Sequence, residues 1–207
     1  MGYTHYYRCK PKYNEDDFLK VVTDFKKIIP ALNHLGIKLA DGSGENQAIL
    51  RPDEIRFNGL RNCGHTQREL GITWPSKNAK GVSKNQVGLQ MAEIVKGHWF
   101  AGASLESRVC GGDCSHETFM LEQEMKNIPD YKIKELDDPK NKGLVFEFTK
   151  TAYKPYDLAV NVALIIAKHY LKEGIMVSSD GEMNNWEEGM NLCQHFLGYG
   201  LDFKLEE

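Results

Sequence analysis

The segment Tyr156–Lys172, YDLAVNVALIIAKHYLK, contains the most apolar run of the chain, Leu158–Ala167. Apolar residues would cover almost every side of a helix formed by this segment, which is typical of a buried helix. Pro155 precedes it and suits the first turn of a helix. The run is interrupted by Asn161 and is shorter than the roughly 18–20 residues that a bilayer requires, so we expect no membrane span. The sequence therefore predicts a central helix that the rest of the chain covers.

The segments on either side predict strands and two further helices. Apolar residues recur at spacings of three and four after Asn14, which indicates a capped helix that ends near Asn33. A last helix should begin at Asn184 or Asn185 and end near Gly198, with Cys193 and Phe196 facing inward. Extended segments are expected at residues 3–9, 37–39, 48–50, 54–57, 117–123, 143–150 and 174–179. This order favours an α+β fold with a mainly antiparallel sheet and about three main helices.

Composition sets limits on the class of protein. The chain has 207 residues, of which 41% are hydrophobic and 27% charged, and its net charge is -3. These values suit a single α+β domain over residues 1–207 that is soluble. The slightly acidic balance argues against sequence-independent nucleic-acid binding, so no nucleic acid is expected as a partner. No apolar signal core occurs near the start, and the five cysteines are an odd number, which together favour a cytoplasmic protein with free or metal-bound thiols.

A loop-rich insertion is predicted at about residues 60–112. Nine of the 19 glycines lie between Gly59 and Gly112, in about a quarter of the chain. Long stretches of this kind inside a domain are usually functional or mobile. One helix, about Lys84–Lys96, is expected within it. Trp74, Trp99 and Phe100 also lie there, and aromatic residues often anchor protein interfaces.

Metal-ligand residues lie at both ends of this insertion. Cys63-Gly64-His65 stands at one end and Cys110-Gly-Gly-Asp-Cys114-Ser-His116 at the other. Zinc prefers four such ligands in a tetrahedron, so the three cysteines with either His65 or His116 would form a closed structural Zn²⁺ site. Free thiols on a glycine-rich loop, or a disulfide from Cys114 to Cys110 or Cys63, are the alternatives. A catalytic zinc is less favoured, because thiolate-rich sites are usually structural and no deaminase signature is present.

A second set of polar residues predicts a pocket for a small anion. Lys150 and Thr151 end a strand, and Lys154 lies just before a helix start, where unpaired backbone N–H groups attract anions. His116 and Glu117 are the best acid–base pair by residue type and are the catalytic candidates. The remaining candidate ligand-binding residues are His5, Asn58, Asp157 and Asp180. Solvated lysines and ordinary helix-capping turns explain several of these residues equally well.

Four short motifs occur in a fixed order along the chain: Gly2-Tyr-Thr-His-Tyr6, His116-Glu-Thr-Phe119, Lys150-Thr-Ala-Tyr-Lys-Pro-Tyr-Asp157 and Ser178-Ser-Asp-Gly181. In this order the chain resembles a family of uncharacterised bacterial and phage proteins that open with GYTHY. The resemblance covers about residues 1–59 and 115–200 and implies no reaction, because no activity is established for such proteins. Members usually carry Arg at the position of Tyr153 and lack the glycine-rich insertion. The metal hypothesis is therefore specific to this chain.

Two functions follow from these patterns. The first is binding, with or without turnover, of a small anionic or phosphorylated ligand, with the insertion held by zinc; whether the protein is an enzyme stays open. The second is a protein-interaction module that uses the aromatic residues of the insertion. The sequence does not fix the oligomeric state.

Overall fold

The apolar segment forms helix α4 (Asp157–Leu171) in the computed structural model. The structure describes residues 3–65, 69–70, 108–126, 128–141 and 143–206. Twelve of the 15 residues of α4 are buried, which confirms the prediction of a central helix. The helix ends at Lys172, whose φ of 49° breaks the helical conformation.

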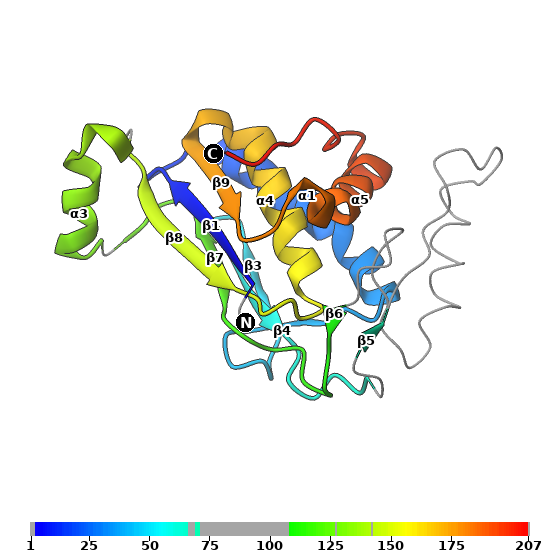
Figure 1. Ribbon diagram of the computed structural model, residues 1–207. Coiled ribbons are helices and arrows are strands. Elements are labelled where there is room, and N and C mark those ends of the chain that lie inside the picture. Colours follow the sequence, from blue (N-terminus) through cyan, green and yellow to red (C-terminus); the bar gives the residue numbers. More distant parts are fainter. Residues whose placement is uncertain (1–2, 66–68, 71–107, 127, 142, 207) are drawn as a thin grey trace.

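Two long helices pack on α4, and both were predicted (Figure 1). Helix α1 (Glu15–His34) is capped by Asn14, whose side chain accepts a hydrogen bond from the N–H of Asp17 at 3.1 Å. Helix α5 (Glu187–Leu197) follows the 3₁₀ turn Met183–Trp186 and ends at Gly198, in the left-handed conformation.

One residue of α5 lies differently from its prediction. Cys193 faces the core as expected, but Phe196 is 38% exposed. The chain turns back at Gly198, and Gly200 approaches Cys193 so closely that a Cβ there would lie 2.7 Å from the cysteine Cβ. The returning segment therefore covers the core at this point, and Phe196 stays outside.

The first sheet is antiparallel and has the order β8–β1–β9. Its strands are β8 (Val145–Lys150), β1 (Thr4–Cys9) and β9 (Ile175–Ser179). In the central strand, Tyr6 lies opposite Phe148 on one side and Ser178 on the other. The side chains alternate, so that His5, Tyr7 and Cys9 are buried.

The second sheet is also antiparallel. Its strands are β2 (Leu39–Ala40), β4 (Glu54–Gly59), β3 (Ile49–Arg51) and β7 (Phe119–Glu122), with β4 paired to the other three. Phe57 on β4 stacks on Phe25 of α1 and also contacts Phe119. Phe119 in turn contacts Tyr7 of the first sheet, so aromatic rings join the two sheets inside the core. The fold is α+β with mainly antiparallel sheets, as predicted.

Three details of the fold differ from prediction. The strand expected at residues 37–39 begins only at Leu39, because Ile37 packs into the core as part of the preceding turn. Helix α3 (Asp130–Asp137) and the 3₁₀ turns Pro139–Asn141 and Lys172–Gly174 were not predicted. Tyr131 and Ile133 of α3 are exposed, so the helix has no apolar stripe that a sequence pattern could reveal.

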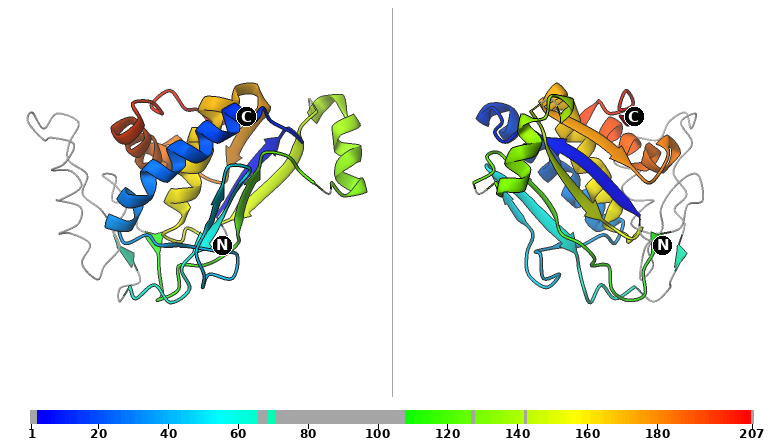
Figure 2. Two further views of the ribbon diagram at one scale, coloured as in Figure 1. Left: turned by 180° about the vertical axis from the view of Figure 1, so that it is seen from behind. Right: turned by 60° about the vertical axis from the view of Figure 1, so that its left-hand side comes forward.

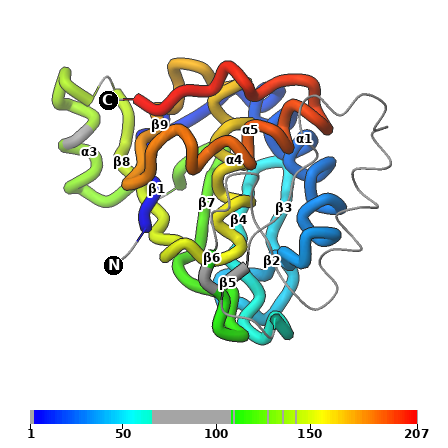
Figure 3. Tube along the Cα trace, turned by 45° about the vertical axis from the view of Figure 1, so that its right-hand side comes forward, coloured from blue at the N-terminus to red at the C-terminus, as the bar shows by residue number. Residues whose placement is uncertain are grey.

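The ends of the insertion lie side by side. Strand β5 (Glu69–Leu70) pairs antiparallel with β6 (Arg108–Val109), next to the end of β4 (Figure 3). The predicted helix at Lys84–Lys96 and the three aromatic residues of the insertion fall outside the described residues. Within the described part of the chain, no helix combines the length and the apolar character that crossing a membrane would require.

Candidate metal centre

Four predicted ligand residues meet at the base of the insertion. Their ligand atoms, from Cys63, His65, Cys110 and Cys114, all lie within 4.8 Å of one another. Cys110 Sγ is 3.2 Å from Cys63 Sγ and 3.3 Å from Cys114 Sγ. These separations are far longer than the about 2.05 Å of a disulfide bond, and all five cysteines are free. The cluster is therefore able to hold a metal ion.

The histidine of the cluster is His65 and not His116. Its Nδ1 lies 3.2 Å from the sulfur atoms of both Cys110 and Cys114. Its Nε2 lies 3.0 Å from the carbonyl oxygen of Gly36, to which it donates a hydrogen bond. A metal-binding histidine usually donates its second ring nitrogen to such an acceptor, which fixes the tautomer and leaves the other nitrogen for the metal.

The local backbone explains why the four residues converge. The N–H of Cys63 bonds to the carbonyl oxygen of Gly112 at 3.3 Å, and the N–H of Cys114 bonds to that of Leu60 at 3.1 Å. Gly64 and Gly112 have φ values of 79° and 85°, which residues with a side chain rarely adopt. The glycines of both motifs therefore let each segment curl so that its sulfur atoms face the other.

The cluster has the electrostatics of a metal-binding site even without an ion. The Cys114 thiol lowers the pKa of Cys110 to about 4, although burial opposes this effect. The same contact, together with burial, raises the pKa of Cys114. The thiolate form is thus favoured at Cys110, and a bound cation would favour the thiolate form of the other sulfur atoms too.

The Cys114 segment is fixed on the end of strand β4. The Asn58 side chain accepts a hydrogen bond from the N–H of His116 at 2.9 Å and donates one to its carbonyl oxygen at 2.8 Å. The next residue, Gly59, has no side chain, so the backbone of Cys114 can lie directly against it. A Cβ at Gly59 would lie 1.9 Å from the carbonyl oxygen of Cys114. Asn58 thus holds the segment that carries Cys114 against the end of β4.

We expect Gly59→Ala to weaken metal retention and to lower the free energy of unfolding by about 1–3 kcal/mol, the usual cost of overpacking. The reason is that the Cys114 backbone must move away from β4. The matched control is Gly111→Ala, because a Cβ at Gly111 meets nothing within 4 Å. Chemical denaturation and metal content of both variants test this, and equal losses in the two would contradict it.

A second cluster, fully buried, includes three predicted ligand residues. Asp157 accepts hydrogen bonds from His5 Nε2 at 2.7 Å and from Thr151 Oγ1 at 2.5 Å. Its other oxygen lies 3.3 Å from Nε of Arg108, whose Nη1 also pairs with Glu188. His5, Arg108 and Asp157 have no exposed surface. We call these five residues the buried ionic cluster.

The neighbouring cations favour the ionised form of Asp157. Burial opposes the charge, but His5 and Arg108 lower the pKa of Asp157 below its ordinary value. Burial would likewise lower the pKa of Arg108, yet Glu188 and Asp157 raise it. Sequence reasoning missed Arg108 and Glu188. Glu188 looks like an ordinary acidic residue in a first helical turn, and no local pattern links it to an arginine 80 positions away.

The predicted lysines and acid–base residues lie apart from the buried ionic cluster. Lys150 is exposed at the end of β8, and Lys154 Nζ donates to the carbonyl oxygen of Asp113 at 2.6 Å. His116 Nδ1 donates to the Lys150 carbonyl oxygen at 2.7 Å, and Glu117 accepts the Lys150 N–H at 2.7 Å. These bonds hold His116 and Glu117 beside the end of β8.

Asp180 has a similar role at the end of β9. It accepts hydrogen bonds from the N–H of Thr4 at 3.0 Å and from the hydroxyl of Tyr6 at 2.9 Å. The structure therefore brings His5, Thr151 and Asp157 together, and leaves Asp180 at the surface beside β1.

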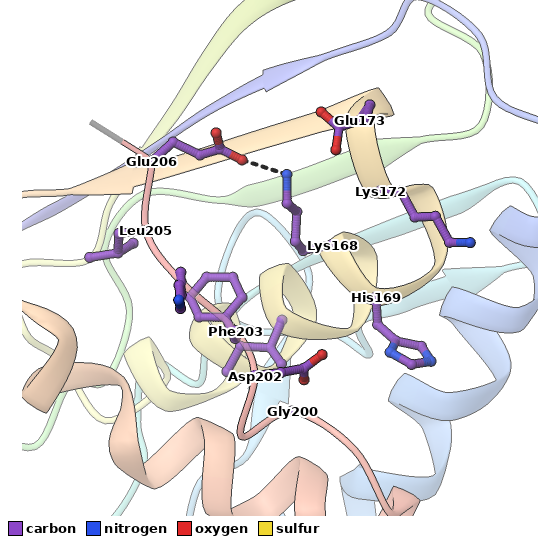
Figure 4. A pocket seen from close by; sticks show the side chains of 11 residues that line it. Lys168, His169, Lys172, Glu173, Gly200, Asp202, Phe203, Leu205 and Glu206 are labelled. Carbon is purple, nitrogen blue, oxygen red and sulfur yellow. Dashed lines mark hydrogen bonds and ion pairs between the residues drawn. The ribbon is translucent and has the colours of Figure 1, made fainter.

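A cavity of about 630 Å³ lies elsewhere, between the end of α4 and the C-terminal segment (Figure 4). None of the predicted site residues lines it. The ion pair between Lys168 and Glu206 crosses one wall. The charges of the residues that line the cavity cancel, with three lysines and three acidic residues: Lys168, Lys172, Lys204, Glu173, Asp202 and Glu206. The described residues that line the cavity therefore carry no excess positive charge that would attract an anion.

Comparisons with known proteins assign no function to these clusters. No protein family matches the chain, and neither does any curated protein or solved structure. The functional interpretation therefore depends on the two clusters and on the surface of the protein itself.

Proposed function

We propose that the protein binds one Zn²⁺ as a structural centre, through Cys63, His65, Cys110 and Cys114. The observation that carries this proposal is the convergence of the four ligand atoms within 4.8 Å. Three thiolates and one imidazole form a complete tetrahedral ligand set, which leaves no open position for a substrate. Soft sulfur ligands also favour zinc over hard cations such as Mg²⁺.

The role of this zinc would be to join the two ends of the insertion. Cys63 lies near its start and Cys110 near its end, so the ion would close a loop of about fifty residues and restrict the unfolded chain. The ion would also fix the position of Arg108, which precedes Cys110 by two residues and enters the buried ionic cluster. Metal binding would therefore support the core as well as the insertion.

Elemental analysis of the purified protein tests the zinc proposal. We expect about one zinc per chain, and His65→Ala should reduce the bound zinc strongly after dialysis against a weak chelator. His116→Ala is the matched control, because this second histidine of the motif lies outside the cluster and should keep the metal. No metal in the wild-type protein, or equal loss in the two variants, would overturn the proposal.

A second proposal is anion binding at Lys150. Its support is that this lysine is exposed at the end of β8, while Lys154 is bound to a backbone carbonyl group and Asp157 belongs to the buried ionic cluster. Chemical shifts of the residues around Lys150 should therefore respond to inorganic phosphate in an NMR titration. An unchanged spectrum at tens of millimolar phosphate would exclude the site. Catalysis by His116 and Glu117, and protein binding by the insertion, stay predictions.

A further inference from the structure

The outer face of the first sheet carries aromatic residues. Because side chains alternate along a strand, the residues beside the buried His5, Tyr7 and Cys9 point to the opposite side of the sheet. We define the outer face by six of these residues: Tyr6, Arg8, Phe146, Phe148, Lys150 and Met176. Phe148 is 53% exposed. In the right-hand view of Figure 2, β1 and β8 lie in front of α4. The outer face is the side of these strands that points away from that helix.

The rings of this face are arranged side by side. The centroids of Tyr6 and Phe146 are 6.1 Å apart with an angle of 21° between the planes. Phe146 and Phe148 are also 6.1 Å apart. The guanidinium carbon of Arg8 lies 5.3 Å from the centroid of the Phe146 ring. Neighbouring rings on an open sheet surface can each stack on a flat ligand group.

The charged side chains among the outward residues of the three strands are cations. Arg8 and Lys150 are cations, and none of the outward residues of the three strands is Asp or Glu. Asp180 follows β9 and is held by Tyr6 and by the backbone of Thr4. Glu206, from the C-terminal segment, lines the small pocket that Tyr6, Arg8 and Phe146 form on this face. The strands of this face therefore offer cations beside aromatic rings, with the acidic groups at its edge.

We propose that the outer face binds single-stranded nucleic acid, with bases stacked on Tyr6 and Phe148 and phosphates near Arg8 and Lys150. Exposed aromatic side chains on a sheet stack with unpaired bases, and cations beside them contact the backbone. The proposal extends the anion proposal for Lys150 and is independent of zinc. The total charge argues only against a protein that coats nucleic acid through a large basic surface.

Fluorescence anisotropy with labelled 12-nucleotide oligouridine and oligothymidine tests this proposal. We expect binding to both strands at low salt, and Phe148→Ala should weaken it by about five- to a hundredfold through the loss of one stacked base. Phe148→Trp should restore binding, because it keeps a stacking surface. Lys150→Gln should weaken binding less and reduce the salt dependence by about one phosphate contact.

The matched control is Phe196→Ala, which removes another partly exposed phenylalanine, on α5. It should leave the affinity unchanged. No binding at low salt, or equal binding by Phe148→Ala, would overturn the proposal. Self-association that Phe148→Ala abolishes, without oligonucleotide binding, would assign the face to a second copy of the chain and would also overturn it. A response to inorganic phosphate without oligonucleotide binding would retain the anion site and reject this extension.

Discussion

Cys110→Ser should abolish metal binding and lower the free energy of unfolding by about 4 kcal/mol. This is the stabilisation that chain entropy assigns to a cross-link closing a loop of about fifty residues. Cys110 is the central ligand, since its sulfur atom lies within 3.3 Å of Cys63, His65 and Cys114. Urea denaturation followed by circular dichroism measures the loss. A strong chelator added to the wild-type protein should produce a similar loss.

A control separates the metal from the general importance of buried thiols. Cys193 is buried but lies outside the cluster. Cys193→Ala should cost stability through lost packing, yet its zinc content and its response to the chelator should equal those of the wild type. If the wild-type protein has the same free energy of unfolding with and without the chelator, the metal does not stabilise the fold.

Asp157→Asn should destabilise the protein by about 3–5 kcal/mol, the usual result of removing one partner from a buried ion pair. The substitution removes the carboxylate beside Arg108 Nε and keeps Glu188 beside its Nη1, at a position where Arg108 has no exposed surface. The pKa of Asp157 lies below its ordinary value, so its contribution is present at neutral pH. It should be lost as the pH falls below about 4, where the unfolded chain takes up the proton first.

The comparison for Asp157→Asn is Asp17→Asn, which removes the carboxylate of an exposed pair with Lys20. That substitution should cost at most about 1 kcal/mol. The double substitution Arg108→Met with Asp157→Asn should cost clearly less than the sum of the two single ones, because the two side chains contact each other. Additive losses, or equal losses for the two aspartates, would show that the buried ionic cluster does not act as a unit.

Much of the fold was predictable because its core elements have strong local patterns. The all-round apolar character of residues 156–172 indicates a buried helix, and Asn14 marks the start of α1. Helix α3 and the outward position of Phe196 were not predictable. Among the residues of α3 whose burial is described, none is fully buried, so no apolar face marks the helix. The position of Phe196 depends on where the chain returns after Gly198.

The cluster of three cysteines and one histidine was predictable as a set of residues but not as a single arrangement. Two cysteine motifs at the ends of one insertion indicated the ligands, whereas the choice of His65 over His116 depends on the end of β4. There, Asn58 directs the backbone of His116 toward β8. A local sequence pattern describes a single helix or strand. The buried ionic cluster joins residues from four helices and strands, so no such pattern could predict it.

X-ray absorption at the zinc edge of the purified protein tests the central claim most directly. The account predicts about three sulfur ligands near 2.3 Å and one nitrogen ligand near 2.0 Å, from the three cysteines and His65. In the His65→Ala protein loaded with zinc and not dialysed, the nitrogen contribution should disappear or be replaced by oxygen. A protein without zinc, or a zinc shell dominated by oxygen and nitrogen, would contradict the account.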